Sequence, residues 1–277
     1  MIHSDFHIHS ENSYDAKNTL EEIAQGAIKQ GLRMVGITDH ANYNDKSFIG
    51  DLHNSAKAVK EIQEKYPFMV LGVELTPIEM PEFEYLQRTG VREGYQPPES
   101  SEPYAIELAQ TKEELIELGV RYAVGASHWR VDVPNGKSKI WDLDACIKEW
   151  YRQQMWLACD ERVTILGHPW CIGNGLWYKD FSVIPHSMNV DIASVLRENG
   201  KYFECNSHFF CTDMTTERFK NQYAEFLREL FEMGLPMTYG SDSHVGYDDK
   251  RQTVESYLEK VGFKDGDISE LSEKDLW

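Results

Sequence analysis

The histidines of this chain are unevenly placed. Six of the ten come at or just after the end of a short apolar, β-rich segment: His7, His9, His40, His128, His168 and His244. Imidazole binds metals and also serves as a general acid or base. In α/β barrels the C-terminal ends of the strands carry the chemistry. The pattern therefore predicts one site that is built from several strand ends.

Carboxylates stand at the same strand ends. His7 and His9 share one face of their strand because residues i and i+2 do so, and Asp242 and His244 repeat this spacing. Glu74 lies in an apolar run, where an unpaired carboxylate is costly. Each histidine alone could be a hydrogen-bonded core residue, but the joint set favours metal ligation. Imidazole with carboxylate suits Zn, Mn or Fe, so we expect two to three divalent ions.

β-rich runs alternate with amphipathic helical patterns. Strands are predicted at Ile2–Ile8, Met34–Thr38, Phe68–Leu75, Tyr122–Ser127, Val163–Gly167, Tyr202–Cys205 and Pro236–Gly240. Helices are predicted at Leu20–Gln30, Leu52–Lys65, Glu107–Leu118, Leu143–Glu161, Asp191–Asn199 and Thr216–Met233. Such alternation favours parallel strands with helical crossovers. We expect an α/β fold, a barrel of seven strands in a single domain over residues 1–277, with insertions near 77–104, 130–142 and 171–185 that wall the site.

The composition limits the partners. A net charge of -18 disfavours binding to a nucleic acid polymer or an anionic membrane. No apolar run approaches the length of a membrane span, and no secretory leader opens the chain. Five cysteines without a C-x-x-C pair argue for reduced thiols. We therefore expect a cytoplasmic protein, whose oligomeric state remains open.

The succession of strand-end motifs resembles the PHP (polymerase and histidinol phosphatase) superfamily. The motifs are H-x-H, Thr-Asp-His, a strand-end Glu, Ser-His, Gly-His-Pro and a terminal Asp-x-His, in order from His7 to His244. This resemblance implies a distorted (β/α)₇ barrel, TIM-barrel-like, with a trinuclear metal centre and phosphoester hydrolysis. Within the superfamily the chain resembles the histidinol-phosphate phosphatases, although the resemblance weakens in the substrate region, where His208, Phe209 and Phe210 stand after Asn206 in place of the expected basic residue.

The resemblance also implies a ligand set. His7, His9 and Asp242 would hold the first metal, Glu74 would bridge to the second, His128 and His168 would complete the second, and Asp15, His40 and His244 would hold the third. Many relatives carry His where Asp15 stands. Asp15 is alternatively a loop acid that caps the helix beginning near Thr19.

The implied mechanism uses Glu74 and Asp242 as the catalytic carboxylates. Two metals about 3.5–4 Å apart would share a bridging hydroxide that attacks phosphorus in line. Arg130, Asn206 and His208 are the candidate substrate-binding residues. Arg130 could equally be a surface residue, and Asn206 could bond the barrel backbone instead. The leaving group would be protonated by Asp39, His208 or metal-bound water.

The substrate is expected to be a small phosphorylated metabolite, histidinol-phosphate-like or nucleotide-like. A ring-bearing leaving group would fit the aromatic residues that follow the strand-end motifs, unless these belong to the core: Trp129, Trp170, Trp177, Tyr178, Phe209 and Phe210. An amidohydrolase-like C–N or C–O hydrolase is a second hypothesis, although no strand end carries the lysine common there. A metal-binding module without turnover is the third.

Overall fold

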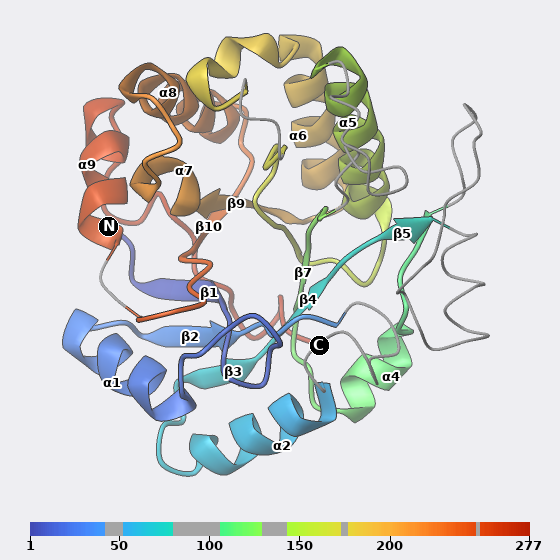
Figure 1. Cartoon of the computed structure of the whole chain (residues 1–277), viewed down its shortest axis with the longest axis vertical. Helices are drawn as coiled ribbons and strands as arrows, with labels where there is room; N and C mark the ends of the chain where they lie inside the picture. Colours follow the sequence, from blue (N-terminus) through green and yellow to red (C-terminus); the bar gives the residue numbers. More distant parts are fainter. Residues whose placement is uncertain (42–51, 80–105, 129–142, 173–176, 248–249) are drawn as a thin grey trace.

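Parallel strands form the centre of the molecule and helices surround them (Figure 1). The computed structural model describes residues 1–41, 52–79, 106–128, 143–172, 177–247 and 250–277. The strands are β1 (Ser4–Ile8), β2 (Met34–Ile37), β3 (Met69–Leu71), β4 (Val73–Leu75), β5 (Ile78–Glu79), β6 (Ile106–Glu107), β7 (Ala123–Gly125), β8 (Ile165–Leu166), β9 (Tyr202–Asn206) and β10 (Met237–Gly240). The helices are α1 (Leu20–Gln30), α2 (Leu52–Gln63), α4 (Lys112–Glu117), α5 (Leu143–Cys159), α6 (His186–Glu198), α7 (His208–Cys211), α8 (Glu217–Glu232) and α9 (Arg251–Lys260), with two 3₁₀ turns, η1 (Trp177–Lys179) and η2 (Phe181–Val183).

The parallel strands are organised in two sheets, ordered β1-β2-β3 and β10-β9-β8-β7-β4. The two sheets are linked by two isolated parallel bridges, Ile8 of β1 with Ser243 after β10, and His40 after β2 with Glu74 of β4. The strands therefore follow one another around a ring, but the regular ladders do not close into one barrel. The predicted α/β fold with parallel strands is confirmed, and the distortion lies at these two junctions.

Helix α1 illustrates how local sequence sets an element. Thr19 caps its first turn, since the Thr19 side chain accepts from the Glu22 amide while the Glu22 carboxylate bonds back to Thr19. This reciprocal arrangement is a capping box. The helix buries Leu20, Ile23, Ala24 and Ala27, and ends at Gly31, whose φ of 68° is favourable only for glycine. Thr19 thus occupies the capping role that was the alternative for Asp15.

Three predicted boundaries were wrong for identifiable reasons. The strand expected over Phe68–Leu75 is divided at Gly72 into β3, which pairs with β2, and β4, which pairs with β7. The helix expected from Glu107 begins only after Thr111, which forms a capping box with Glu114. The helix expected from Asp191 begins five residues earlier, directly after Pro185, because proline is well suited to a helix start.

Other elements were not predicted. β5 and β6 form a short antiparallel pair, α7 is a single turn after β9, and α9 carries many charged residues that obscure its apolar face. Of the expected insertions, 130–142 and most of 77–104 lie outside the described residues, and 171–185 is described except for 173–176.

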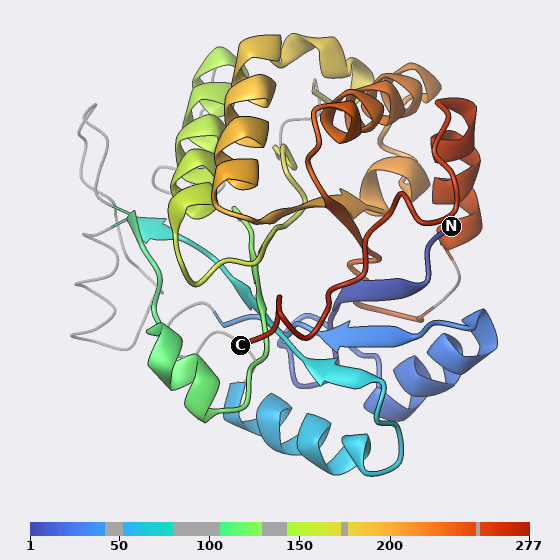
Figure 2. The same ribbon diagram turned by 180° about the vertical axis from the view of Figure 1, so that it is seen from behind.

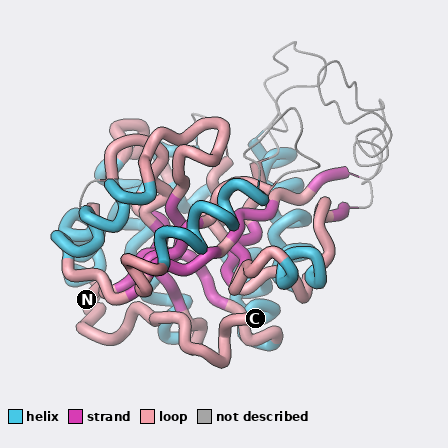
Figure 3. The backbone as a smooth tube through the Cα atoms, turned by 90° about the horizontal axis from the view of Figure 1, so that it is seen from below, coloured by secondary structure: helices cyan, strands magenta, loops and turns pink. Residues whose placement is uncertain are grey.

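The C-terminal segment closes the side of the barrel opposite the histidines. It crosses the strands in the view from behind (Figure 2), and helices lie around the strands from below as well (Figure 3). The Ser269 amide donates to the Met237 carbonyl at 2.7 Å, and Leu271 packs with Phe6 and Tyr122. None of the five cysteines, all of which lie in the described part of the chain, is joined in a disulfide. Within the described residues, none of the helices has the length and apolar character that a membrane crossing needs.

Candidate metal centre

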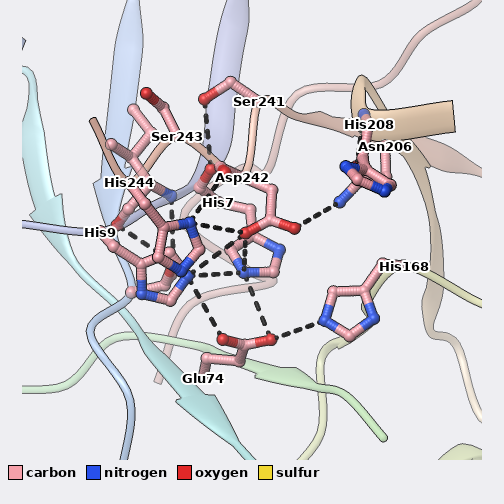
Figure 4. A network of polar contacts seen from close by, with 12 residues as sticks. His7, His9, Glu74, His168, Asn206, His208, Ser241, Asp242, Ser243 and His244 are labelled. Atoms are coloured by element: carbon pink, nitrogen blue, oxygen red, sulfur yellow. Dashed lines mark hydrogen bonds and ion pairs between the residues drawn. The ribbon is translucent and has the colours of Figure 1, made fainter. Parts of the chain in front are cut away.

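Glu74 is the centre of the polar cluster at the strand ends. Its side chain is buried on β4, and both carboxylate oxygens face imidazole nitrogens (Figure 4). Oε1 lies 2.9 Å from His168 Nε2, 3.3 Å from His128 Nε2 and 3.4 Å from His7 Nε2. Oε2 lies 2.9 Å from His40 Nδ1 and 3.3 Å from His9 Nε2. One carboxylate therefore contacts five of the six strand-end histidines.

Asp242 approaches the cluster from the segment after β10. Its Oδ1 lies 3.7 Å from His7 Nε2, 3.5 Å from His9 Nε2 and 3.5 Å from His244 Nδ1. Asp242 adopts a φ of 52°, and its backbone N–H donates to the His7 carbonyl at 2.8 Å. A non-glycine residue in this region is uncommon and often marks a functional position. The turn aims the carboxylate at β1.

Asp15 lies beside His40 and His244 on the other flank of the cluster. Its Oδ2 is 3.3 Å from His40 Nε2 and 3.4 Å from His244 Nε2. Ser13 Oγ donates to the other oxygen, Oδ1, at 3.1 Å. The Asp15 side chain is 31% exposed, so this flank is more open to solvent than Glu74.

The neighbouring groups orient several of the imidazoles. The Nδ1 atoms of His7, His128 and His244 face Glu204 Oε1, Thr76 Oγ1 and the Asp242 carbonyl at 2.7, 2.8 and 3.0 Å respectively. A carboxylate or carbonyl can only accept, so His7 and His244 donate from Nδ1. Their Nε2 atoms then point into the cluster as possible ligands.

The cluster satisfies the requirements of a metal centre. Three groups have ligand atoms that all lie within 4.8 Å of one another: His9, Asp15, His40 and His244; His7, His9 and Asp242; and His40, Glu74 and His128. Because His9 and His40 each occur in two groups, the groups form one continuous cluster. His168 is outside the third group, but its Nε2 lies 3.2 Å from His128 Nε2. The structure thus brings together all nine residues that the resemblance implied.

The arrangement of atoms and charges also fits divalent cations. The Nε2 atoms of His7 and His9 lie 3.2 Å apart, and the buried Glu74 Oε2 faces imidazole nitrogens of His40 and His9 at 2.9 and 3.3 Å. Among the described residues, the ion pairs of Glu74, Asp242 and Asp15 all go to histidines. One buried and two partly exposed carboxylates, gathered with no lysine or arginine partner among the described residues, favour a further positive charge at this place. Bound metal ions would provide it.

The pKa values reflect this electrostatic coupling. Burial raises the pKa of Glu74, but the surrounding charges of His128, His7 and His40 hold it well below its ordinary value. Burial lowers the pKa of His40, yet Glu74 and Asp15 raise it to about 10. Because metal ligands must be deprotonated, an ion that binds His40 would have to displace a proton from it.

Two buried carboxylates of this region were not singled out from the sequence. Asp5 accepts from the backbone N–H groups of His7 and Ser241 and from the Tyr247 hydroxyl, and burial raises its pKa to about 6. Glu204 contacts His7 Nδ1 from β9. Glu204 interrupts a fully buried strand, which is the same signal that identified Glu74.

The candidate substrate residues have different surroundings. Asn206 Nδ2 donates to Glu204 Oε2 at 3.1 Å and to Asp242 Oδ2 at 3.4 Å, and its Oδ1 accepts from the His208 amide. The polar atoms of the Asn206 side chain are therefore engaged in hydrogen bonds within the protein. His208 lies beside Asn206, whose amide reaches Asp242 (Figure 4), and burial lowers the pKa of His208. Arg130 lies outside the described residues.

The structure also gives the surroundings of Asp39, one of the candidate proton donors, and of the aromatic residues. Asp39 is buried and accepts from the Ser10 amide, the Ser10 hydroxyl and the Ser55 hydroxyl, so both of its carboxylate oxygens are engaged by these donors. Three of the aromatic side chains are buried and pack in the hydrophobic core: Trp170, Phe209 and Phe210. Tyr178 has its ring 6.4 Å from that of His208. Trp129 and the side chain of Trp177 lie outside the described part of the chain.

Comparisons with known proteins agree with this geometry. The sequence pattern of the PHP domain matches residues 5–208. A protein of Acetivibrio thermocellus named a probable phosphatase is 28% identical over 265 residues, which cover 93% of this chain and 86% of that protein. A histidinol phosphate phosphatase of Lactococcus lactis, solved with zinc, L-histidinol and phosphate, superposes with a TM-score of 0.67 at 16% identity, covering 99% of this chain and 98% of that one. A histidinol phosphatase candidate of Listeria monocytogenes has a TM-score of 0.63 at 14% identity, covering 90% and 97%. The two structures show a shared fold.

Proposed function

Because this chain belongs to the PHP domain family, we propose that it is a metal-dependent phosphatase that hydrolyses a small phosphomonoester. The observation that carries the proposal is the position of Glu74 among five imidazoles, with Asp242 and Asp15 on either flank. The probable phosphatase with 28% identity supports the reaction class. The histidinol and phosphate bound in the Lactococcus lactis enzyme support a small phosphorylated metabolite as substrate.

The chain's own residues would divide the work as follows. His7, His9 and Asp242, with Glu74, His128 and His168, would hold two ions, and Asp15, His40 and His244 would hold a third. Bound divalent ions supply a water of lowered pKa and positive charge for the phosphoryl oxygens. His208, beside Asp242, would bind a phosphate oxygen or give a proton to the leaving oxygen. Asn206 would hold Asp242 and the His208 backbone in position.

A panel of phosphomonoesters tests the reaction class. We expect hydrolysis of p-nitrophenyl phosphate, histidinol phosphate or nucleoside monophosphates when Mn, Zn or Fe is added, with the highest kcat/KM identifying the leaving group. Release of amines or alcohols from amide and ester substrates, with no phosphate release, would instead indicate an amidohydrolase-like enzyme. Metal binding without any turnover would indicate a regulatory module.

Metal content gives an independent prediction. Protein purified without chelator should contain two to three equivalents of transition metal per chain, measured by mass spectrometry. Chelation should lower the melting temperature, because a metal ion stabilises the folded state by about 2.7 kcal/mol when its free concentration is 100 times its Kd. Less than one equivalent, with no gain on reconstitution, would contradict the proposed centre.

A further inference from the structure

Glu204 joins three parts of the cluster that come from different strands. It lies on β9 and is 1% exposed. Its Oε1 is 2.7 Å from His7 Nδ1 on β1. Its Oε2 accepts from the backbone N–H of His168, after β8, and from Asn206 Nδ2 at 3.1 Å. Each oxygen of this carboxylate is therefore engaged by N–H donors.

The surrounding backbone makes room for this carboxylate. A methyl group at Gly240 would collide with Glu204 Oε1 and with the His7 side chain. His168 itself has a φ of 23°, an unfavourable value for a residue with a side chain, and its backbone N–H is directed at Glu204. Strained backbone persists where surrounding contacts enforce it, so Glu204 helps to hold His168 in this conformation.

We propose that Glu204 is a positioning residue that sets the tautomer of His7 and thereby creates the first metal ligand. By accepting from Nδ1–H, the carboxylate leaves the Nε2 lone pair of His7 directed at Glu74, His9 and Asp242. Such contacts behind a metal-bound histidine fix its ring and raise its basicity. The inference rests on the proposed metal centre, and it assigns a role to a residue that binds no metal itself.

Glu204→Gln should reverse this tautomer although it is nearly isosteric. The position of Oε2 faces two groups that can only donate, the His168 N–H and the Asn206 amide. The amide oxygen of the glutamine must therefore take that position, which places its NH₂ opposite His7 Nδ1. An NH₂ group can only donate to that nitrogen, so a neutral His7 would carry its proton on Nε2, the atom needed for the metal. Rotation of Asn206 cannot relieve the conflict without losing the bond from the His208 amide.

Asp5→Asn is the matched control, because it also replaces a buried carboxylate by an amide next to His7. Asp5 Oδ1 accepts from the His7 and Ser241 backbone, and Oδ2 accepts from the Tyr247 hydroxyl at 3.1 Å. An asparagine can keep its oxygen at Oδ1 and donate from Nδ2 to the same hydroxyl, which can turn to accept. The ring of His7 is not involved.

The test is a zinc titration against a chromophoric chelator for the wild-type chain and both variants, with circular dichroism to verify folding. We expect Glu204→Gln to weaken one zinc site by about 10- to 100-fold, the usual effect of removing such a partner, and Asp5→Asn to change it by less than about twofold. Equal zinc affinity of Glu204→Gln and wild type would overturn the inference. Wild-type protein that binds no zinc would overturn the proposed centre, and the inference with it.

A second measurement detects the tautomer of His7 directly in the wild-type protein. In zinc-loaded wild-type protein labelled with ¹⁵N-histidine, His7 should show a retained Nδ1–H resonance and a zinc-bound Nε2. The resonance is assigned by its absence in His7→Gln. The opposite arrangement, with zinc at Nδ1 and a proton on Nε2, would contradict the role of Glu204.

Discussion

Glu74→Gln should abolish phosphoester hydrolysis and remove at least one equivalent of metal. Among the carboxylates of the described cluster, only Glu74 contacts five of its histidines. These are His7, His9, His40, His128 and His168, which come from strands of both sheets. A neutral amide offers a weaker oxygen and an NH₂ that would face imidazole nitrogens. We expect kcat/KM to fall about a thousandfold or more, equivalent to about 4 kcal/mol of transition-state stabilisation.

The measurement combines phosphate release, metal content and circular dichroism on the same preparation. Asp5→Asn, which exchanges a buried carboxylate for an amide without touching an imidazole ring, should retain metal and most of the activity. His128→Ala should also abolish hydrolysis, because His128 Nε2 is one of the nitrogens at Glu74 Oε1. Near-normal turnover of folded Glu74→Gln would exclude Glu74 from the reaction.

Strand ends were predictable because their sequence signal is strong. β1, β2, β9 and β10 are short, buried and terminated by polar residues, so the end of each apolar run places its histidine or acid at one edge of the sheets. The convergence of His7 with His168, by contrast, depends on the ring of strands. No local pattern states which strands are neighbours, and the family resemblance provided that information.

The positioning residues were harder to predict than the candidate ligands. Glu204 was visible as a charge inside the strand Tyr202–Asn206, but its partners are 36 and 197 residues away in the chain. The partner of Asp5 after β10, Ser241, is 236 residues away. Such hydrogen bonds depend on which strands lie next to one another and not on the spacing of residues along the chain. Only the three-dimensional structure therefore identifies them. Asn206 is similar, since its amide is engaged by Glu204 and Asp242.

The proposed third metal position would depend on Asp15, for which the sequence left two roles open. Thr19 caps α1 by itself, so Asp15 is free of that role, and its Oδ2 faces both His40 and His244. Burial raises the pKa of Asp15, but His244 and His40 lower it well below the ordinary range of a carboxyl. The group is therefore an anion, and an anionic oxygen favours Mn or Mg more than a third imidazole would.

Asp15→Asn should release the most exchangeable metal and lower turnover, with partial recovery at high Mn because His40 and His244 remain. Asp15→His should tighten Zn at this position and reduce the benefit of added Mn. Thr19→Ala is the control for disturbance of the same loop and helix: it should cost about 1 kcal/mol of folding free energy but leave metal content unchanged. Metal analysis and Mn-dependent kinetics on the three variants test the assignment. Full metal content and full activity in Asp15→Asn would show that Asp15 is not a ligand of the third ion.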